Sequence, residues 1–197
     1  MRKNRLKGKI IVFIIIAGLI IASALFAGLL SPNDPYATNA EAIRIAPCKE
    51  FLFGTDNLGR CVFSRVLYGG RTTIASTFIL VAISFIIGTF VGMISGYYGG
   101  LADRGLMRGA DVVLAFPQMV IAIAVAGIIG GGMAGAMFAL GVTMWVSFAR
   151  LARSHTYTVK NEAFISAALL AGKGNLYIIF KHIFPNLLPS VLTNALT

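Results

Sequence analysis

The sequence predicts an all-α protein that crosses a lipid bilayer several times, and three observations lead to that fold class. First, the 197 residues are 57% hydrophobic and only 12% charged, about half the charged fraction of an average soluble domain. Second, the apolar residues gather in uncharged runs that are long enough to span a bilayer as helices. Third, the basic residues stand in the gaps between these runs, as in membrane proteins. That placement also argues against a nucleic-acid partner, despite a net charge of +10.

The first predicted span is the uncharged run from Ile10 to Leu30. Its 21 residues contain one polar side chain, Ser23, and a helix of that length crosses a hydrocarbon core of about 30 Å. A basic start and an apolar run also occur in secretory signal peptides, but this run is too long and no small-residue cleavage site follows it. The next segment, Ser31–Pro35, contains two prolines that end the helix. We therefore expect an uncleaved first span.

The second predicted span lies within Thr73–Tyr97. It contains glycines at positions 88, 92 and 96, and small residues at four-residue spacing allow helix backbones to approach closely in lipid. In a chain with 22 glycines, the alternative is that these three have no packing role.

Two more spans are predicted in the uncharged run Val112–Ala149, which has 38 residues. We expect a tight turn near Gly130–Gly132 between them, and Pro117 in the first turns of the third span, where its missing N–H costs least. A final apolar run begins at Leu187 and is too short to cross by the end of the sequence.

The charged residues between the spans predict that the amino terminus is cytoplasmic. If spans alternate, the amino-terminal segment, the connection 101–111 and the segment after the fourth span lie on one side. That side carries twelve Lys and Arg residues, against five on the other side, where segment 31–71 also holds four acids. Because Lys and Arg are enriched in cytoplasmic loops, we expect segment 31–71 to be external and segment 150–182 to be cytoplasmic.

Residues 150–185 form the segment in which the sequence is most specific. Glu162–Ala171 predicts a short helix, with Asn161 as its N-cap and Gly172 as its C-terminal stop. A second short apolar and basic stretch, Leu176–Phe184, follows and ends at the next proline. Such helices need a surface to cover, and two choices stay open on physical grounds: the membrane interface or a groove on a partner protein.

The same segment resembles the coupling loop, or EAA loop, of the permease subunits of ABC importers. That motif has Glu-Ala-Ala, three further residues, a glycine, and an apolar run that ends near His-Ile-x-Pro. Here Ser166 stands in place of the glutamate, and Glu162 lies one turn earlier. The resemblance implies that the loop docks on an ATPase through the following residues: Glu162, Phe164, Ser166, Ala167, Ala168, Gly172, His182 and Pro185.

Two other segments resemble the second permease subunit of dipeptide, oligopeptide and nickel importers. Segment 53–69 is similar to that family's F/L-G-T-D-x-x-G-R-D-x-x-S-R motif, with Cys61 in place of an aspartate. Its matching residues are Gly54, Thr55, Asp56, Gly59, Arg60, Ser64 and Arg65. Segment 97–117 is similar to the family's stretch with Y-G-G, M-R and F-P. Its matching residues are Asp103, Met107, Arg108, Asp111 and Pro117.

The resemblance implies a helical bundle of the ABC-importer permease type in two parts. Residues 1–72 hold the first span and the external loop, and residues 73–197 hold the other spans and a coupling loop at about 150–185. Family members complete a fifth span and add a sixth, whereas this sequence stops at Thr197. We therefore expect a bundle that is truncated before its last span.

The resemblance also implies a non-catalytic, multi-pass inner-membrane subunit that forms the translocation path for peptides or nickel chelates. The implied partners are a second permease subunit, two ATP-binding subunits, an extracytoplasmic solute-binding protein and membrane lipid. We expect no cofactor on this chain, with ATP and magnesium in the ATP-binding subunits, because the sequence has no G-x-x-x-x-G-K-[ST] motif.

The rival interpretation is a small channel or a membrane enzyme. An enzyme needs a convergent set of His, Asp, Glu or Cys residues, and the predicted spans supply none. A channel needs a polar pore lining, for which the spans offer mostly glycine, serine and threonine. The spacing of His155 and His182 does not favour a metal site. Two points stay open: whether Cys48 and Cys61 pair, and whether the charges of segment 103–111 form a cluster or are solvated helix ends.

Overall fold

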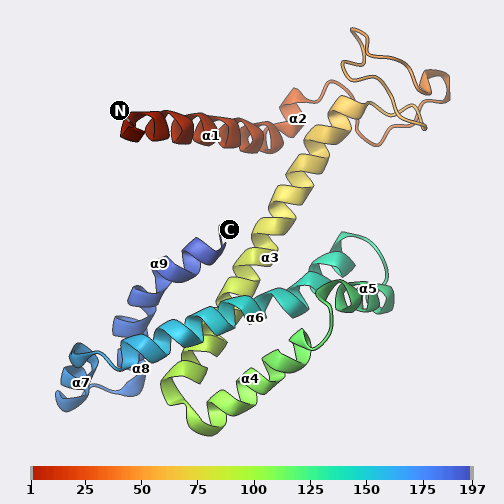
Figure 1. The fold of residues 1–197 in the computed structure, drawn as a ribbon. Coiled ribbons are helices and arrows are strands. Elements are labelled where there is room, and N and C mark those ends of the chain that lie inside the picture. Colours follow the sequence, from red (N-terminus) through yellow and green to blue (C-terminus); the bar gives the residue numbers. More distant parts are fainter. Residues whose placement is uncertain (1, 196–197) are drawn as a thin grey trace. The chain divides into compact units, whose positions relative to one another are not determined.

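The computed structural model describes residues 2–195. Apart from one isolated antiparallel bridge between Thr55 and Cys61, these residues form helices and loops (Figure 1). Among them, four helices are long and apolar enough to cross a membrane, or five spans if one bent helix pair counts as a span. The predicted all-α, multi-span fold class is confirmed. The chain divides into two compact units, Met1–Ser76 and Thr77–Thr197.

The amino-terminal unit begins with α1 (Arg2–Leu25), followed by the single-turn helix α2 (Ala27–Leu30). The predicted first span, Ile10–Leu30, is therefore one helix to Leu25 and is interrupted at Phe26. The irregular segment that follows contains a 3-10 turn, η1 (Ala40–Ala42), and leads into α3.

Helix α3 (Val62–Tyr98) is 37 residues long, or about 55 Å, and exceeds the thickness of a hydrocarbon core. It begins eleven residues before Thr73, so the predicted external segment 31–71 ends in helix rather than in loop. The glycine pair Gly69–Gly70 does not interrupt it, and Gly70 lies where an added Cβ would be 3.9 Å from the Ala24 methyl group. Helix α3 therefore continues through two residues of low helix propensity, as is common in membrane helices.

Helices α4 (Gly100–Leu114) and α5 (Gln118–Ile129) meet at an angle of 86°. The prediction that the third span starts near Val112, with Pro117 inside its first turns, is wrong, because Pro117 is the N-cap of α5. Proline has no N–H for the helix and disfavours helical backbone in the residue before it. Helix α5 alone is 12 residues, about 18 Å, so a span here needs both helices.

The predicted turn at Gly130–Gly132 is confirmed, because α5 ends at Ile129 and α6 (Met133–Lys160) begins directly after it. Helix α6 has 28 residues and so continues through the first part of the segment expected to be a loop. The residues that follow α6 contain the short helix α7 (Ala163–Leu170).

The last helical segment is continuous from α8 (Asn175–Ile178) through the π-helical turn η2 (Ile179–Ile183) to α9 (Phe184–Ala195). The prediction that a stretch ends at Pro185 is wrong, because this proline lies in the first turn of α9. The wide turn in front of it bonds Phe184 N–H to the Ile179 carbonyl, five residues back, at a place where a proline ring would otherwise clash with an α-helical carbonyl.

The last predicted run also starts earlier than expected. A 19-residue stretch, Asn175–Thr193, is long and apolar enough to cross a membrane, whereas the prediction began at Leu187 and was too short. The final two residues of the predicted run, 196 and 197, lie outside the described part.

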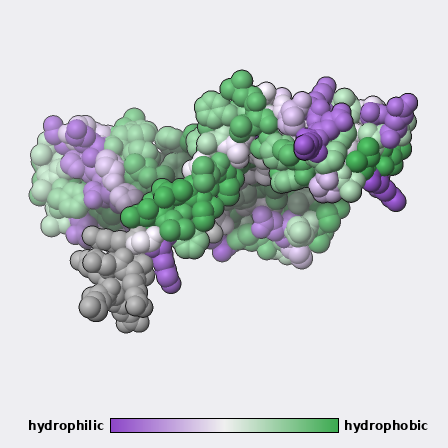
Figure 2. Space-filling view, turned by 90° about the horizontal axis from the view of Figure 1, so that it is seen from above, coloured by the Kyte–Doolittle hydropathy of each residue, from purple (hydrophilic) through white to green (hydrophobic). Residues whose placement is uncertain are grey.

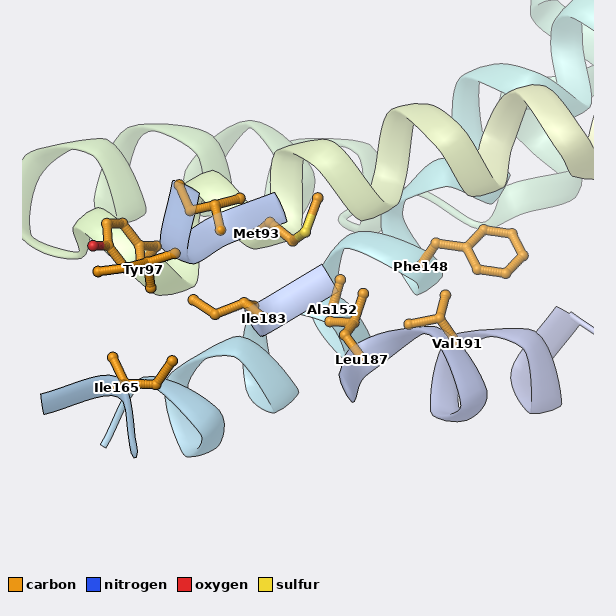
Figure 3. Close-up of a cluster of buried hydrophobic side chains, with 10 residues drawn as sticks. Met93, Tyr97, Phe148, Ala152, Ile165, Ile183, Leu187 and Val191 are labelled. Atoms are coloured by element: carbon orange, nitrogen blue, oxygen red, sulfur yellow. The ribbon is translucent and has the colours of Figure 1, made fainter. Parts of the chain in front are cut away.

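The buried core of the second unit gathers side chains from α3, α6, α7, η2 and α9 (Figure 3). Met93 and Tyr97 come from α3, Phe148 from α6 and Ile165 from α7, and they meet Ile183 and its neighbours of the last helical segment. Outside this cluster the surface is mostly apolar and is broken by polar patches, as expected for helices that face lipid (Figure 2).

Candidate functional site

The glycines at positions 88, 92 and 96 place α3 directly against α6, which confirms the packing role predicted from their spacing. A Cβ added at Gly88, Gly92 or Gly96 would meet a backbone carbonyl oxygen of α6. Those oxygens belong to Trp145, Ala149 and Arg153, in the same order along the two helices. Because backbone packs against backbone, the two helices cannot shift past one another without clashes.

Two ion pairs join α4 to α6 on the segment that resembles the family's M-R and F-P stretch. The guanidinium of Arg153 donates to both carboxylate oxygens of Asp103, and Arg150 Nη2 lies 2.6 Å from Asp111 Oδ1. The two acids of this segment therefore pair with arginines of α6 rather than with Arg104 or Arg108, so they neither form a cluster within segment 103–111 nor are merely solvated. Because these pairs are partly or fully exposed, they contribute orientation more than stability.

The other residues of this motif have separate positions. Met107 is half-buried on α4, Arg108 is exposed, and Pro117 stands at the bend before α5. Sequence reasoning missed Arg150 and Arg153 as partners of the acids. A signal existed, since the predicted cytoplasmic side carries only three acidic residues in the sequence, and two of them are Asp103 and Asp111.

Helix α7 starts differently from the prediction and ends as predicted. Asn161 is not its N-cap but the C-cap of α6, where the side-chain amide donates to the Tyr157 carbonyl at 2.9 Å. Glu162 is the N-cap, without a side-chain capping bond. At the other end, Gly172 has φ +73°, and the N–H groups of Gly172 and Lys173 bond back to the helix carbonyls. This is the glycine stop that the sequence predicts.

One side chain holds α7 to the core, and most of the others face outward. Ile165 is fully buried, at 0% exposure, and Ala168 is half-buried. Phe164 and Leu169 are exposed. The outward residues of the candidate loop are Glu162, Phe164, Ser166, Ala167, Leu169, Leu170 and Gly172. A short helix with one buried residue and an apolar outer face is suited to docking in a groove.

His182 lies beside α7, because its ring is 6.0 Å from the Phe164 ring and 5.7 Å from the Tyr177 ring. The structure thus brings three aromatic rings together at the outer edge of the candidate loop. Pro185 is exposed in the first turn of α9 and does not join this group. Among the described residues, no three side chains of His, Cys, Asp or Glu are gathered in the manner of a metal site.

The second candidate region is the loop that resembles the G-T-D-x-x-G-R motif. Thr55 Oγ1 donates to the Ala42 carbonyl and accepts from the Ile45 N–H at 2.8 Å, so this buried side chain joins two stretches of backbone. Gly59 has φ +73°, and a Cβ there would collide with the Asn39 carbonyl. The left-handed backbone and the lack of space for a Cβ both require glycine at this position.

Asp56 is the centre of the polar contacts in this loop. Its Oδ1 accepts the backbone N–H groups of Leu58 and Arg60, and its Oδ2 accepts Arg60 Nε at 2.9 Å and a guanidinium nitrogen of Arg65. Partial burial by itself raises the pKa of this carboxyl, but the hydrogen bonds and charge of Arg60 outweigh it and hold the pKa far below its ordinary value. The carboxylate is therefore charged throughout the physiological range.

The remaining residues of this motif support the same loop. The Asn33 backbone N–H donates to the buried Ser64 hydroxyl at 3.4 Å, and Gly54 is buried in the turn before the Thr55–Cys61 bridge. The two cysteines are free thiols, Cys48 exposed and Cys61 buried.

A cavity of about 540 Å³ lies in the second unit between α3 and α6. Its lining is apolar apart from Ser84, and it includes Leu80, Ile83, Phe138 and Trp145. Such a lining is suited to an apolar group rather than to a charged or zwitterionic solute.

Residues 88–197, more than half of the chain, match the family described as the binding-protein-dependent transport system inner membrane component. The chain is 38% identical over 195 residues to the dipeptide transport system permease protein of Alkalihalophilus pseudofirmus, which covers 99% of this chain and 63% of that protein.

Two further relatives have similar identity. The glutathione transport system permease protein of Pectobacterium atrosepticum is 38% identical over 177 residues, which cover 88% of this chain and 58% of that protein. A probable D,D-dipeptide transport system permease protein of Escherichia coli is 34% identical over 181 residues, 92% of this chain and 61% of that protein. The chain thus spans about three fifths of the length of these curated relatives.

The apolar helices and these matches together make the chain a multi-pass inner-membrane protein whose relatives are permease subunits of transport systems. The chain belongs to the family of binding-protein-dependent transport system inner membrane components.

Proposed function

We propose that this chain is a non-catalytic permease subunit of an ATP-driven importer and that α7 is its docking helix for an ATP-binding subunit. The observation that carries the proposal is the position of α7: the buried Ile165 side chain fixes the helix to the core, while its outer face is apolar and exposed. Leu170 is 90% exposed at the end of that face. A water-facing leucine of this kind costs free energy unless a partner covers it.

The proposed orientation has the amino terminus and α7 in the cytoplasm. The distribution of Lys and Arg supports it. The ion pairs from Asp103 and Asp111 to α6 add support, because they bring α4 to the same end of α6 as α7. All the connections predicted to be cytoplasmic in this unit are then on one side.

The proposed substrates are peptides or peptide-like solutes, delivered by an extracytoplasmic solute-binding protein. This rests on the names of the relatives, which are dipeptide and glutathione transport permeases. Transport of nickel chelates stays a prediction from the sequence motif. The proposed complex also includes a second permease subunit and two ATP-binding subunits, which would hold the ATP and magnesium.

The experiment is co-purification of the chain with its candidate ATP-binding subunits from membranes. Leu170→Glu places a charge on the proposed docking face without disturbing the core, and we expect it to reduce the retained ATPase at least about tenfold. Leu101→Glu is the matched control, because Leu101 is also apolar and 81% exposed but lies on α4. It should retain the ATPase as the unchanged chain does.

The two variants separate the possible outcomes. Loss of the ATPase from Leu170→Glu alone supports docking through α7. Equal retention by both variants, or equal loss from both, contradicts it. Replacing the whole of residues 162–184 would be a weaker test, because α8 and η2 are part of the last helical segment.

A further inference from the structure

Tyr97 lies at the end of α3 and contacts both ends of the loop that carries α7. Its side chain is 6% exposed, and its hydroxyl donates to Asn175 Oδ1 at 3.0 Å. Asn175 is the first residue of α8 and so stands immediately after the loop. A buried tyrosine hydroxyl needs such a partner, because an unpaired one is costly.

Lys160 is the last residue of α6 and stands immediately before the same loop. Its ammonium donates to the Tyr97 backbone carbonyl and lies 5.4 Å from the centre of the Tyr97 ring. The carbonyl belongs to the last turn of α3, where a cation is favoured by the helix dipole and by unpaired carbonyl groups. The ring face adds a second attraction for the same cation.

Residues 161–174 therefore run from Lys160 to Asn175, and both of these flanking residues contact Tyr97. We call the contacts among Tyr97, Lys160 and Asn175 the Tyr97 junction. Between these two points, Ile165 is the fully buried contact of α7 with the core, and it joins the cluster to which Tyr97 also belongs (Figure 3). The base of the loop is thus bonded to α3, and not only to its neighbours in sequence.

The position of α3 makes this junction suitable for transmitting motion. Gly96, one residue before Tyr97, packs against the Arg153 carbonyl and Thr156 of α6, so α3 and α6 move together at this end. Arg153 in turn pairs with Asp103 of α4. A displacement of α7 that is carried through the Tyr97 junction would therefore reach three long helices at once.

We propose that Tyr97 is a positioning residue that couples movement of α7 to α3 through its hydroxyl. This rests on the proposed function, since the movement is supplied by a docked ATP-binding subunit. The hydrogen bond keeps the loop base rigid, so a push on α7 displaces α3 instead of bending the loop. Without the bond the ATPase still docks and hydrolyses ATP, but transport falls per ATP consumed.

The test compares Tyr97→Phe with Asn175→Leu and Asn175→Asp in the complete transporter, reconstituted in lipid vesicles. Tyr97→Phe and Asn175→Leu both remove the bond, and we expect each to lower the transport-to-hydrolysis ratio about fivefold, the factor of one neutral hydrogen bond. The double variant should fall no further than either single variant. Asn175→Asp keeps the acceptor oxygen, so we expect it to keep most of the transport-to-hydrolysis ratio of the unchanged chain.

Tyr98→Phe is the matched control, since Tyr98 is the adjacent tyrosine but is 51% exposed. Amide hydrogen exchange of residues 161–178 in the membrane-embedded chain alone gives a readout that needs no partner. Exchange should rise about fivefold in Tyr97→Phe and stay unchanged in Tyr98→Phe.

The outcomes distinguish this inference from the proposed function. In Tyr97→Phe, faster amide exchange together with a lower transport-to-hydrolysis ratio and unchanged ATPase retention supports the role of Tyr97. A normal ratio in Tyr97→Phe, or unchanged exchange, overturns it while leaving docking through α7 intact. Failure of the unchanged chain to retain any ATPase would instead contradict the proposed function.

Discussion

The two candidate regions, the loop around Asp56 and the helix α7, both consist of ordered backbone between long helices, but different forces hold them. The Asp56 loop is held by polar bonds: one carboxylate accepts four donors, and Thr55 joins two backbone stretches. The α7 region is held by a buried isoleucine and by helices in backbone contact. One region therefore depends mainly on charge and dihedral angle, and the other mainly on volume, although the Tyr97 junction and the left-handed Gly172 also hold the loop that carries α7.

This difference suits the predicted location of the loop and the role proposed for α7. A polar loop retains its shape in water without a large core, as a segment predicted to lie outside the membrane requires. A region held by close packing moves as a rigid body, because packed interiors do not deform continuously. Substitutions that change one property at a time can test whether the division is real.

The largest expected effect comes from filling the contact between α3 and α6. Gly92→Leu inserts a side chain where even a Cβ meets the Ala149 carbonyl, and we expect a loss of about 3 kcal/mol or more of stability. Thermal unfolding of the detergent-solubilised chain measures it. Gly105→Leu on α4 is the control, because nothing lies within 4 Å of a Cβ there. If Gly92→Leu unfolds at the same temperature as Gly105→Leu, the volume argument is wrong.

A smaller and more local effect is expected from alanine at two glycines with the same φ of +73°, Gly59 and Gly172. Left-handed backbone costs a residue with a Cβ about 1–2 kcal/mol in either place. Gly59→Ala adds a collision with the Asn39 carbonyl, whereas Gly172 has open space around it. Amide exchange should therefore rise more in residues 39–61 of Gly59→Ala than in α7 of Gly172→Ala. Equal increases would mean that dihedral strain alone decides both positions.

The smallest effect is the dependence of the Asp56 loop on pH. The pKa of Asp56 is depressed in the folded loop relative to its ordinary value of 3.8, so the charged form favours the ordered loop. Its contribution is fully present above about pH 4 and declines as the pH falls below that value. Exchange of residues 39–61, corrected for the intrinsic rate, should then rise in acid. Asp56→Asn should exchange faster at neutral pH and show a flatter profile, and a profile parallel to the unchanged chain would exclude Asp56 as the cause.

Much of the fold could be predicted because it depends on local patterns. The long uncharged runs indicated the membrane helices, and the turn at Gly130–Gly132 and the stop at Gly172 followed from backbone preferences that glycine alone satisfies. The spacing of Gly88, Gly92 and Gly96 predicted a close contact between helices, although it did not identify α6 as the partner.

The errors occurred where distant residues decide. Helix α3 begins at Val62 because the folded loop before it holds that start, with the Val62 N–H bonded to the Gly54 carbonyl. The pairing of Asp103 with Arg153 joins residues 50 positions apart. Tyr97 begins the segment 97–117 that resembles a family stretch, but its contacts with Lys160 and Asn175 arise only from the folded arrangement. Such contacts leave no periodic trace in the sequence.

The π-helical turn Ile179–Ile183 has a consequence for how this segment tolerates changes in length. Five residues of an ordinary α-helix would rotate the chain about 140° beyond one full turn, yet Ile178 and Ile183 are both fully buried in the same cluster. The turn thus behaves as a helix with a single residue inserted. Deleting one residue there would leave an ordinary α-helix with nearly the same rotational phase between α8 and α9, whereas inserting one more residue would shift that phase by about 100° and turn Asn175 away from Tyr97.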